Sequence, residues 1–427
     1  MHITILTYGS RGDIQPFVAL GVELMRSGHQ VRLAVPALFK EFVMAQGLEF
    51  AALSGDPQAL LRSDAGQELL KAGANGLKFL KSFGALVRLD LPGVLADSLG
   101  ACAGTDLIVA TAFTFWGLEI SQAMNIPCIF ANVNALSPTR EFAIPSVPSG
   151  LVPPILNKLT YPLSLIPFWQ LYRAPLNAWR KSELGLPPLG IFDEPIDRLQ
   201  KTNMPFLYGI SPSVLPRPQD WPTHLHMTGY WYLDQPDFQP SASLINFLDS
   251  GKPPVYIGFG SMAERDATEL TEIVLASLLK SGQRGLLLSG WGGIQQTDLP
   301  DTVLKVDSAP HDWLLPKMAA VIHHGGAGTT AAALRSGRPS MAVPFFGDQP
   351  FWGDRSAMLG VGVRAVPRLK LSIDTLSASI DALVNNQSFK ANANQLADRI
   401  ALENGTKNAV NIIQSYLQSS SVDNATL

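Results

Sequence analysis

Two adjacent histidines followed by glycines and threonines are the residues of this chain best suited to bind a phosphate. The segment from His323 to Thr330 reads HHGGAGTT, after a short β-branched run and before a helix-forming run that ends at Gly337. A glycine turn between a strand and a helix presents free backbone N–H groups and the positive end of the helix dipole to an anion. His324 and Thr329 can add side-chain donors.

We interpret this turn as a diphosphate cradle. It lacks the Gly-Lys-Ser/Thr ending of a P-loop and the G-x-G-x-x-G spacing of a dinucleotide-binding fingerprint. The alternative is an ordinary tight turn between a strand and a helix that holds a structural pair of histidines.

A second polar pair, Asp348 and Gln349, stands inside an aromatic stretch. The stretch from Pro344 to Arg355 reads PFFGDQPFWGDR. A carboxylate accepts hydrogen bonds and an amide both donates and accepts them, which suits a ring of sugar hydroxyls. The alternative is that Asp348 caps a helix whose aromatic residues belong to the core.

Asp13 is the candidate general base. It follows the first predicted strand in a turn with glycines at Gly9 and Gly12. A carboxylate in such a turn can take the proton of a hydroxyl that attacks another molecule. Asp13 could instead only cap the helix that is predicted to begin near Ile14.

Composition limits the class of protein. The 427 residues carry a net charge of −3, with 46% hydrophobic and 16% charged residues, which is typical of a globular protein and gives no basic surface for nucleic acid. Cys102 and Cys128 have neither disulfide-framework nor metal-site spacing and favour a reducing cytosol. The first residues lack the pattern of a signal peptide, and no apolar window reaches the length of a transmembrane helix.

Strands and helices alternate twice along the chain, so the fold class is predicted as α/β with two Rossmann-like parallel-sheet domains facing a central cleft. The predicted boundaries are a domain at 1–215, a proline-rich linker at 216–240, a domain at 241–405, and a C-terminal helix and tail at 406–427. The predicted strands are Ile3–Tyr8, Gln30–Val35, Asp106–Ala110, Cys128–Val133, Pro254–Phe259, Gly285–Ser289, Val303–Asp307, Ala320–His323 and Ser340–Val343. The predicted helices include Ile14–Ser27 and Ala267–Ser281.

The apolar stretch Leu151–Trp179 is interrupted by several prolines, and its part Leu151–Leu171 is predicted to be rich in loops. It carries Phe168 and Trp169 and is followed by Arg180 and Lys181, so it could meet an anionic membrane and receive a lipid. The alternative is a pair of buried helices that pack on the first domain, with solvated charges around them, and we favour burial for most of the stretch.

Taken together, these segments resemble the family 1 glycosyltransferases of GT-B fold. The likeness is strongest to the branch that glucosylates sterols and to the antibiotic glycosyltransferases of actinobacteria. Besides His323 to Arg355, the segments that carry it are YGSRGDIQP at Tyr8–Pro16, YGISPS at Tyr208–Ser213, TGYW at Thr228–Trp231, IGFGSM at Ile257–Met262 and SAPHDWL at Ser308–Leu314.

The resemblance implies that the second domain binds a UDP-sugar as co-substrate, with no further cofactor. It assigns the donor to Ser261, Trp291, Ala309, His311, His324, Gly326, Ala327, Gly328, Thr329, Asp348 and Gln349. Plant relatives carry a Trp and a Gln where this chain has Ser308 and His311, so the group that stacks on the base stays open and Trp291 is a candidate. No Asp-x-Asp stands in the chain, so no metal bridge to the diphosphate is implied.

The resemblance makes the first domain the acceptor domain, with Asn132, Asn134, Phe168 and Trp169 as candidate contacts. Asn132 and Asn134 could equally be turn residues. The antibiotic enzymes carry an aspartate at the position of Asp13, where plant relatives carry a histidine. The expected reaction is inverting transfer of glucose from UDP-glucose to a hydrophobic alcohol such as a sterol, by a cytoplasmic protein that touches the membrane peripherally or not at all.

Three alternatives stay open at this point. The acceptor could be a polyketide, macrolide or carotenoid, with a TDP-sugar as donor. The chain could be a catalytically inactive nucleotide-binding partner, against which the intact Asp13, His324, Asp348 and Gln349 argue. A dehydrogenase is disfavoured because the dinucleotide fingerprint is missing.

Overall fold

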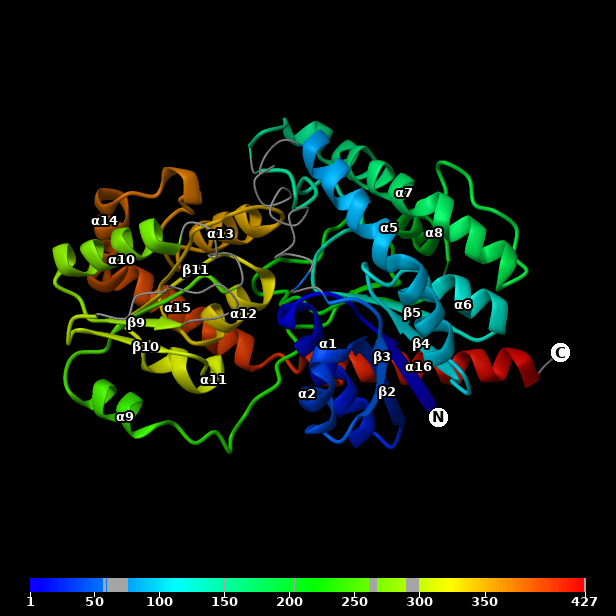
Figure 1. Ribbon diagram of the computed structural model, residues 1–427, viewed down its shortest axis with the longest axis horizontal. Coiled ribbons are helices and arrows are strands. Elements are labelled where there is room, and N and C mark those ends of the chain that lie inside the picture. The colour runs from blue at the N-terminus through cyan, green and yellow to red at the C-terminus, as the bar shows by residue number, and fades with distance from the viewer. Residues whose placement is uncertain are drawn as a thin grey trace.

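The computed structural model describes residues 1–56, 59, 76–148, 150–202, 204–260, 267–288 and 299–425 of the 427. Two parallel β-sheets, each flanked by helices, stand side by side (Figure 1). The first sheet contains β1 (His2–Leu6), β2 (Gln30–Pro36), β3 (Glu49–Leu53), β4 (Leu107–Ala110), β5 (Cys128–Asn132), β6 (Phe206–Tyr208) and β7 (Leu225–Met227). The second contains β8 (Val255–Gly258), β9 (Gly285–Leu288), β10 (Val303–Val306), β11 (Ala320–His323) and β12 (Ser340–Ala342).

In each sheet the strand order has a point of reversal, where a ligand-binding crevice is expected. The first sheet runs β3-β2-β1-β4-β5-β6-β7, and the second runs β10-β9-β8-β11-β12. The order reverses direction between β1 and β4 and between β8 and β11, and ligands of such sheets bind beyond the carboxyl ends of the strands at that reversal. The turns after β1 and β11, which carry Asp13 and His324, therefore lie where a ligand is expected.

Helices cover both sheets. In the first half they are α1 (Arg11–Arg26), α2 (Lys40–Met44), α5 (Gly76–Ala101), α6 (Gly117–Met124), α7 (Asn157–Ser182) and α8 (Pro195–Gln200). In the second half they are α9 (Ala242–Asp249), α10 (Ala267–Ser281), α11 (His311–Leu314), α12 (Ala327–Arg335), α13 (Gln349–Met358), α14 (Ile373–Asn385), α15 (Gln387–Ala401) and α16 (Gly405–Ala425). Short 3-10 turns are η1 (Ala37–Phe39), η2 (Pro154–Leu156), η4 (Leu315–Lys317) and η5 (Arg368–Lys370).

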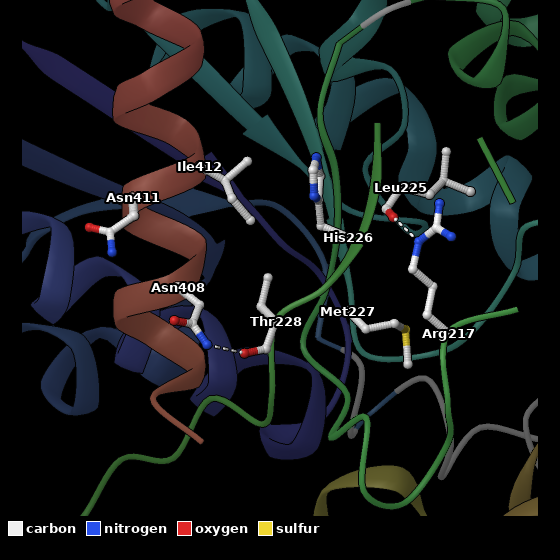
Figure 2. Close-up of a pocket in the computed structure, with 8 residues that line it drawn as sticks. All are labelled: Arg217, Leu225, His226, Met227, Thr228, Asn408, Asn411 and Ile412. Atoms are coloured by element: carbon white, nitrogen blue, oxygen red, sulfur yellow. Dashed lines mark hydrogen bonds between the residues drawn. The ribbon is translucent and has the colours of Figure 1, made fainter. Parts of the chain in front are cut away.

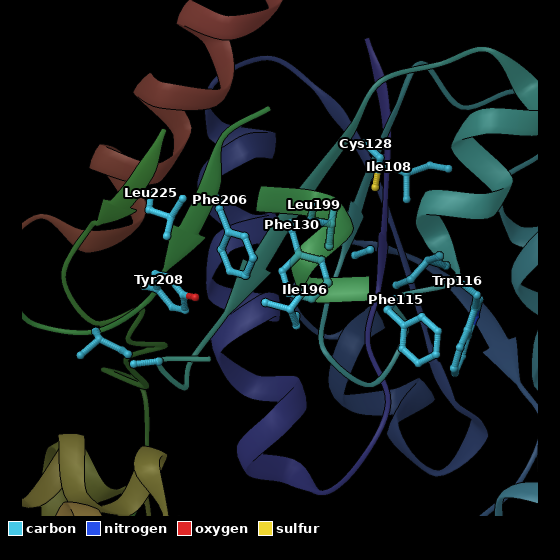
Figure 3. Packing of buried hydrophobic residues seen from close by; sticks show 14 of the residues in the cluster. Ile108, Phe115, Trp116, Cys128, Phe130, Ile196, Leu199, Phe206, Tyr208 and Leu225 are labelled. Carbon is cyan, nitrogen blue, oxygen red and sulfur yellow. The ribbon is translucent and has the colours of Figure 1, made fainter. Parts of the chain in front are cut away.

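The central strands are buried along their whole length, as expected for parallel strands covered on both faces. Figure 3 shows part of the core of the first half, where Phe130, Phe206 and Tyr208 pack ring against ring across β5 and β6. Ile196 and Leu199 of α8 belong to the same cluster. This burial makes the sheet a rigid support for the turns at its edge.

The chain returns to the first half at its end. Helix α16, red in Figure 1, packs along α1, and its Ala409, Val410 and Ile413 share a core with Ile3 and Ile5 of β1. The span 216–240, predicted as a linker, includes β7, which pairs with β6 and extends the first sheet. Thus part of this span belongs to the first sheet.

The prediction of two parallel-sheet halves is confirmed. The strands β1, β2, β4, β5 and β8 to β12 stand where the sequence places them, within a residue or two, and α10 has the predicted bounds. The sequence reading missed β3, β6 and β7. Strands β6 and β7 have three residues each, too few to show a periodic pattern.

The prediction that Leu151–Leu171 is rich in loops is wrong, and the favoured alternative of buried helices is closer to the structure. Most of this stretch forms α7, a helix of 26 residues with Pro162, Pro167 and Pro175 inside it. Each proline removes a helix hydrogen bond and strains the turn before it. Buried Tyr161, Trp169 and Leu176 offset that cost by packing on the first half. Among the described residues, no helix is both long and apolar enough to cross a membrane.

Candidate functional site

The turn after β11 is held in place by His323 and by the start of α13. Gly325 has φ +93°, and a Cβ there would lie 2.8 Å from the carbonyl oxygen of Gln349, so only glycine fits. The Gly325 N–H donates to Nδ1 of His323 over 3.0 Å. Burial, followed by the neighbouring His324 and His311, lowers the pKa of His323 to about 3, so this ring is neutral. His323 is thus a structural residue, as the alternative interpretation of the histidine pair had it.

His324 lies over the glycines of the turn. A Cβ on Gly326 would come within 2.5 Å of its Nε2, and a Cβ on Gly260 after β8 would lie 3.8 Å from its Cε1. Burial, and then the charge of His311, lowers its pKa to about 4. A hydrogen bond to the Gly258 backbone opposes this shift. A neutral imidazole donates through one nitrogen, so a hydrogen bond from His324 to a phosphate oxygen would replace the one to Gly258 and add no full charge.

Helix α12 begins at this turn without a side-chain cap. Its N-cap residue is Gly326, which offers no side-chain acceptor to the first backbone N–H groups of the helix. Gly328 is exposed, and Ala327 and Thr329 are partly exposed. The predicted residues Gly326 to Thr329 therefore form one turn whose N–H groups are free for an anion.

The turn after β1 meets the turn after β11. A Cβ on Gly328 would lie 3.9 Å from the Cα of Gly12, so the N-termini of α1 and α12 abut. Arg11, the first residue of α1, is close enough for its charge to contribute to lowering the pKa of His311 in the second half. Two helix N-termini from distant parts of the sequence therefore converge at one place.

Helix α1 begins at Arg11, before the predicted start near Ile14, and its N-cap is Ser10. Asp13 is the third residue of the helix and forms a capping box with Ser10. Its Oδ2 accepts hydrogen bonds from the Ser10 backbone N–H at 2.8 Å and the Ser10 hydroxyl at 2.9 Å. Gly9, with φ +136°, makes room for the carboxylate, because a Cβ there would lie 2.5 Å from Oδ2. Burial raises the pKa of Asp13, and the Ser10 bonds oppose that shift. The capping role is present in the structure, and a carboxyl group can cap through one oxygen and act on a substrate with the other.

Asp348 faces the same junction. It occupies the N-cap position of α13, yet its Oδ2 accepts from the Trp352 indole N–H at 2.8 Å and no side-chain cap bond forms. Its pKa is raised to about 6, chiefly by burial and also by the charge of Asp13, while Trp352 and Asn134 oppose the shift. Asp13 and Asp348, one from each half, are therefore neighbours.

Gln349 is buried at 5% exposure and has a structural task. Its Oε1 accepts from the backbone N–H groups of Phe345 at 2.7 Å and Phe346 at 3.3 Å. Its amide NH₂ is the group of this side chain that could meet a sugar hydroxyl.

The remaining predicted donor residues are split between described and undescribed segments. His311 begins α11, where its Nε2 shares a hydrogen bond of 3.1 Å with the Tyr256 hydroxyl, and burial followed by Arg11 lowers its pKa to about 4. Ala309 is partly buried just before it. Ser261 and Trp291 lie outside the described residues.

The predicted acceptor residues have unequal positions. Asn132 is buried and donates from Nδ2 to the Asn134 carbonyl at 3.0 Å, so it holds the turn after β5. Asn134 reaches the junction, where its Oδ1 lies 3.2 Å from the Trp352 indole nitrogen. Trp169 is a core residue whose indole donates to the Gly190 carbonyl at 3.0 Å. Asn134 thus joins the site, whereas Trp169 does not.

Phe168 belongs to an aromatic cluster between α5 and α7. Its ring lies 5.5 Å from that of Phe83, and Phe83 and Phe115 both contact Tyr172 edge to face. The pKa of Tyr172 is raised by burial and then by the neighbouring Tyr8, the residue that precedes Gly9. The cluster therefore extends to the turn that carries Asp13.

Arg180 is not a solvated charge, contrary to the sequence reading. It is 1% exposed and pairs with buried Glu119, which also binds Arg198. A buried carboxylate with two guanidinium partners satisfies its charge within the fold. Arg180 is therefore unavailable to a membrane.

A surface cavity of about 420 Å³ lies away from these turns (Figure 2). It is lined by residues of β7 and α16, with Asn408 donating to the Thr228 carbonyl at 2.9 Å, and it contains none of the predicted site residues. The part of the chain that the structure describes holds no group of three or more His, Cys, Asp or Glu placed to bind a metal ion.

Comparison with protein families gives two matches. Residues 3–143 match the glycosyltransferase family 28 N-terminal domain, and residues 292–414 match the C-terminal domain of the erythromycin biosynthesis protein CIII-like family. The first match covers the turn of Asp13, and the second covers the turns of His311, His324 and Asp348.

Curated relatives extend over nearly the whole chain. It is 35% identical over 433 residues to a sterol 3-beta-glucosyltransferase of Arabidopsis thaliana, covering 98% of this chain and 68% of that protein. It is 36% identical over 428 residues to a sterol 3-beta-glucosyltransferase of Yarrowia lipolytica, covering 97% of this chain and 28% of that protein. The chain thus spans less than a third of the length of that fungal relative.

Solved structures share the fold. The glycotransferase of kitacinnamycin matches with a TM-score of 0.71 and 17% identity, over 97% of this chain and 98% of that chain. The calicheamicin glycosyltransferase matches with a TM-score of 0.69 and 16% identity, over 98% of both chains. At this level of identity the likeness concerns the arrangement of the two halves.

Proposed function

Because this chain belongs to the GT-B glycosyltransferases related to sterol 3-beta-glucosyltransferases and antibiotic glycosyltransferases, we propose that it transfers glucose from UDP-glucose to the hydroxyl of a hydrophobic alcohol such as a sterol. The observation that carries the proposal is the meeting of two turns. One is the uncapped N-terminus of α12, and the other bears Asp13.

The donor is assigned to the turn of α12. A diphosphate carries negative charge that free N–H groups, a helix N-terminus and a neutral His324 can all stabilise. The same groups stabilise the charge that develops on the leaving UDP, so the reaction needs no metal bridge in this scheme. Asp348 and the amide of Gln349 are assigned to the sugar hydroxyls.

Asp13 is assigned to the acceptor. Its carboxylate takes the proton of the acceptor hydroxyl while that oxygen bonds to the anomeric carbon, and the bond from this carbon to the UDP oxygen breaks. Attack from the face opposite UDP inverts the anomeric centre and gives a β-glucoside from an α-linked donor. Burial raises the pKa of Asp13, which makes the carboxylate a stronger base.

The hydrophobic acceptor is assigned to the aromatic cluster of Phe83, Phe115, Phe168 and Tyr172. The link through Tyr8 places this cluster beside the turn of Asp13. Aromatic side chains offer a large apolar surface to a ring system such as a sterol. The acceptor hydroxyl would then point from the cluster toward Asp13.

Peripheral membrane contact is assigned to an exposed apolar stripe on η2 and α7. Ile155, Leu159 and Leu163 recur every fourth residue with exposures of 88%, 55% and 74%. A helix face of this kind lies in the headgroup boundary of a bilayer, where a lipid acceptor resides. Replacing the three stripe residues with serine should abolish sedimentation with phosphatidylcholine–phosphatidylserine vesicles and spare turnover of a detergent-dispersed sterol. Unchanged sedimentation would refute the contact.

A second candidate is glucosylation or deoxysugar transfer to a polyketide-type natural product. The match of residues 292–414 to the erythromycin biosynthesis protein CIII-like domain favours it. The two candidates share Asp13 and the donor turn and differ in acceptor and nucleotide.

One panel separates the candidates. The purified protein is incubated with UDP-glucose or TDP-glucose and with a sterol, a macrolide or a flavonoid, and products are detected by mass and by the NMR coupling of the anomeric proton. We expect a β-glucoside of the sterol with UDP-glucose. A product only with TDP-glucose and the macrolide would favour the second candidate, and no product with any pair would overturn both.

A further inference from the structure

Helix α13 joins the two halves of the molecule. Its Phe351 ring lies 5.6 Å from that of Phe142 in the first half, and its Arg355 donates to the Val214 carbonyl. Trp352 is 1% exposed and belongs to a core cluster made largely of first-half residues. The helix that begins with the predicted sugar-binding pair is therefore anchored across the junction.

The indole N–H of Trp352 is shared between the halves. It lies 2.8 Å from Oδ2 of Asp348, one helical turn earlier, and 3.2 Å from Oδ1 of Asn134 after β5. Trp352 has one N–H, and both neighbours present an oxygen to it. A single donor thus links the acceptor-side asparagine to the donor-side carboxylate.

The bond to Trp352 replaces the hydrogen bond that an aspartate at an N-cap usually makes. An aspartate at an N-cap normally accepts a backbone N–H of its own helix, at the second or third position. The second position of α13 is Pro350, which has no N–H, and the third is Phe351. Asp348 makes no such side-chain bond and binds Trp352 instead. Oδ2 of Asp348 is thereby fixed by Trp352, and Asn134 also hydrogen-bonds the carboxylate.

We propose that Trp352 is a positioning residue that holds the Asp348 carboxylate toward the donor sugar and makes this orientation depend on contact between the two halves through Asn134. The inference rests on the proposed function, in which Asp348 binds the sugar of UDP-glucose. Without the indole N–H, the Asp348 carboxylate can rotate to accept a hydrogen bond from the Phe351 backbone N–H. In that orientation it no longer contacts the sugar.

The test compares binding of UDP-glucose with binding of UDP by titration calorimetry. Trp352→Phe keeps the apolar packing and removes the N–H. We expect it to weaken binding of UDP-glucose by roughly tenfold, the range for a lost hydrogen bond to a charged group, and to leave the affinity for UDP unchanged. Phe142→Leu is the matched control, because it trims the junction and does not contact Asp348.

Two further readouts separate positioning from packing. Asn134→Ala should weaken binding of UDP-glucose by a smaller factor in the wild type and by less still in Trp352→Phe, where only the direct hydrogen bond of Asn134 to Asp348 is left to lose. The acid limb of UDP-glucose binding, set by Asp348 with a pKa of about 6, should move to higher pH in Trp352→Phe, because the lost bond favours the ionised carboxylate. The titratable group facing Asp348 across the junction, among the described residues, is Asp13 of α1.

The outcomes are distinguishable. Equal weakening of UDP and UDP-glucose in Trp352→Phe, or equal effects of Phe142→Leu, would overturn the positioning role. If Asp348→Asn itself leaves the ratio of the UDP and UDP-glucose dissociation constants unchanged, the assignment of Asp348 to the sugar in the proposed function is wrong, whatever Trp352 does. Should Trp352→Phe not fold, Asn134→Ala decides alone: a selective loss of UDP-glucose binding supports the link, and no loss contradicts it.

Discussion

The turns after β1 and β11 are built alike and present opposite chemistry. Each follows a buried central strand, each has a glycine with positive φ, and each leads into a helix whose N-terminus meets the other at Gly12 and Gly328. In α1 the first turn is capped by its own Asp13, whereas in α12 the N-cap is a glycine with no side-chain acceptor. The capped turn therefore presents a carboxylate, and the uncapped turn presents N–H groups.

This difference explains how one fold unit can serve two ligands. A carboxylate whose pKa is raised by burial can accept a proton from a hydroxyl. In the proposed function, free N–H groups beside a neutral histidine would stabilise a diphosphate. Because the two turns abut, the proposed reaction has a proton acceptor near the attacking hydroxyl and an anion site near the leaving diphosphate.

The largest expected effect comes from removing the charge of the capped turn. Asp13→Asn should lower turnover by roughly 10³-fold, within the range for a general base, while UDP affinity stays near that of the wild type. The asparagine oxygen can still accept the Ser10 N–H, so the cap survives. The measurement is steady-state kinetics together with UDP titration.

Ser10→Ala is the control for the capping role of Asp13. It removes the hydroxyl bond to the carboxylate and the bond that the Ser10 side chain accepts from the Asp13 backbone N–H, keeps the carboxylate itself, and should change turnover by a small factor. If Asp13→Asn turns over like the wild type and only its melting temperature falls, Asp13 acts only in helix capping. The two turns would then differ in structure, and the turn of Asp13 would have no catalytic role.

The next effect comes from filling the uncapped turn. Gly326→Ala places a Cβ within 2.5 Å of His324 Nε2, so the ring must move, and UDP affinity should fall by roughly tenfold. The backbone of Gly326, with φ −61° and ψ 147°, accepts alanine without strain. The measurement is UDP titration of the single variant and of the variant in a His324→Ala background, where the added loss should vanish.

Gly328→Ala is matched to Gly326→Ala. A Cβ there makes only an ordinary contact of 3.9 Å with Gly12, and UDP affinity should stay close to the wild-type value. Equal losses in the two variants would show that the turn tolerates no side chain anywhere, and the assignment of His324 to the phosphate would not stand.

The smallest effect concerns the support of the uncapped turn. The folded-state pKa of His323 is about 3, below the ordinary 6.5, so between these values the unfolded chain binds a proton that the folded chain does not. Stability from this group is present above pH 6.5 and is lost as the pH falls, by roughly 2 kcal/mol at pH 5. His323→Asn, which keeps an acceptor for the Gly325 N–H, should show a shallower loss of melting temperature between pH 7 and 5. Parallel curves for the two proteins would contradict this role.

The two turns could be predicted from the sequence because their determinants are local. Glycines, a leading strand and a following helix lie within ten residues in each case, and the resemblance of the flanking motifs added roles for Asp13 and His324. The roles themselves, apart from the capping by Asp13, remain proposals.

What the sequence did not predict depends on distant packing. The link from Asn134 to Trp352 joins residues far apart in the chain, although the spacing of Asp348 and Trp352, four residues apart at a helix start, is a local sign that they could interact. The prolines of α7 argue locally against a helix, and the burial of Trp169 outweighs them. In the same way, Arg180 next to Lys181 looks solvated until Glu119 is brought to it by the fold.

The proposed function requires the uncapped turn of α12 to bind the diphosphate of a uridine nucleotide. Its most direct test is the melting temperature of the protein with UDP and with NAD at equal concentration, in the wild type and in Gly326→Ala. Because a ligand that binds the folded state stabilises it, UDP should raise the wild-type melting temperature, the shift should shrink in Gly326→Ala, and NAD should give none. A wild-type protein that shifts with neither UDP, TDP nor UDP-glucose, or that shifts equally with NAD, would contradict the account.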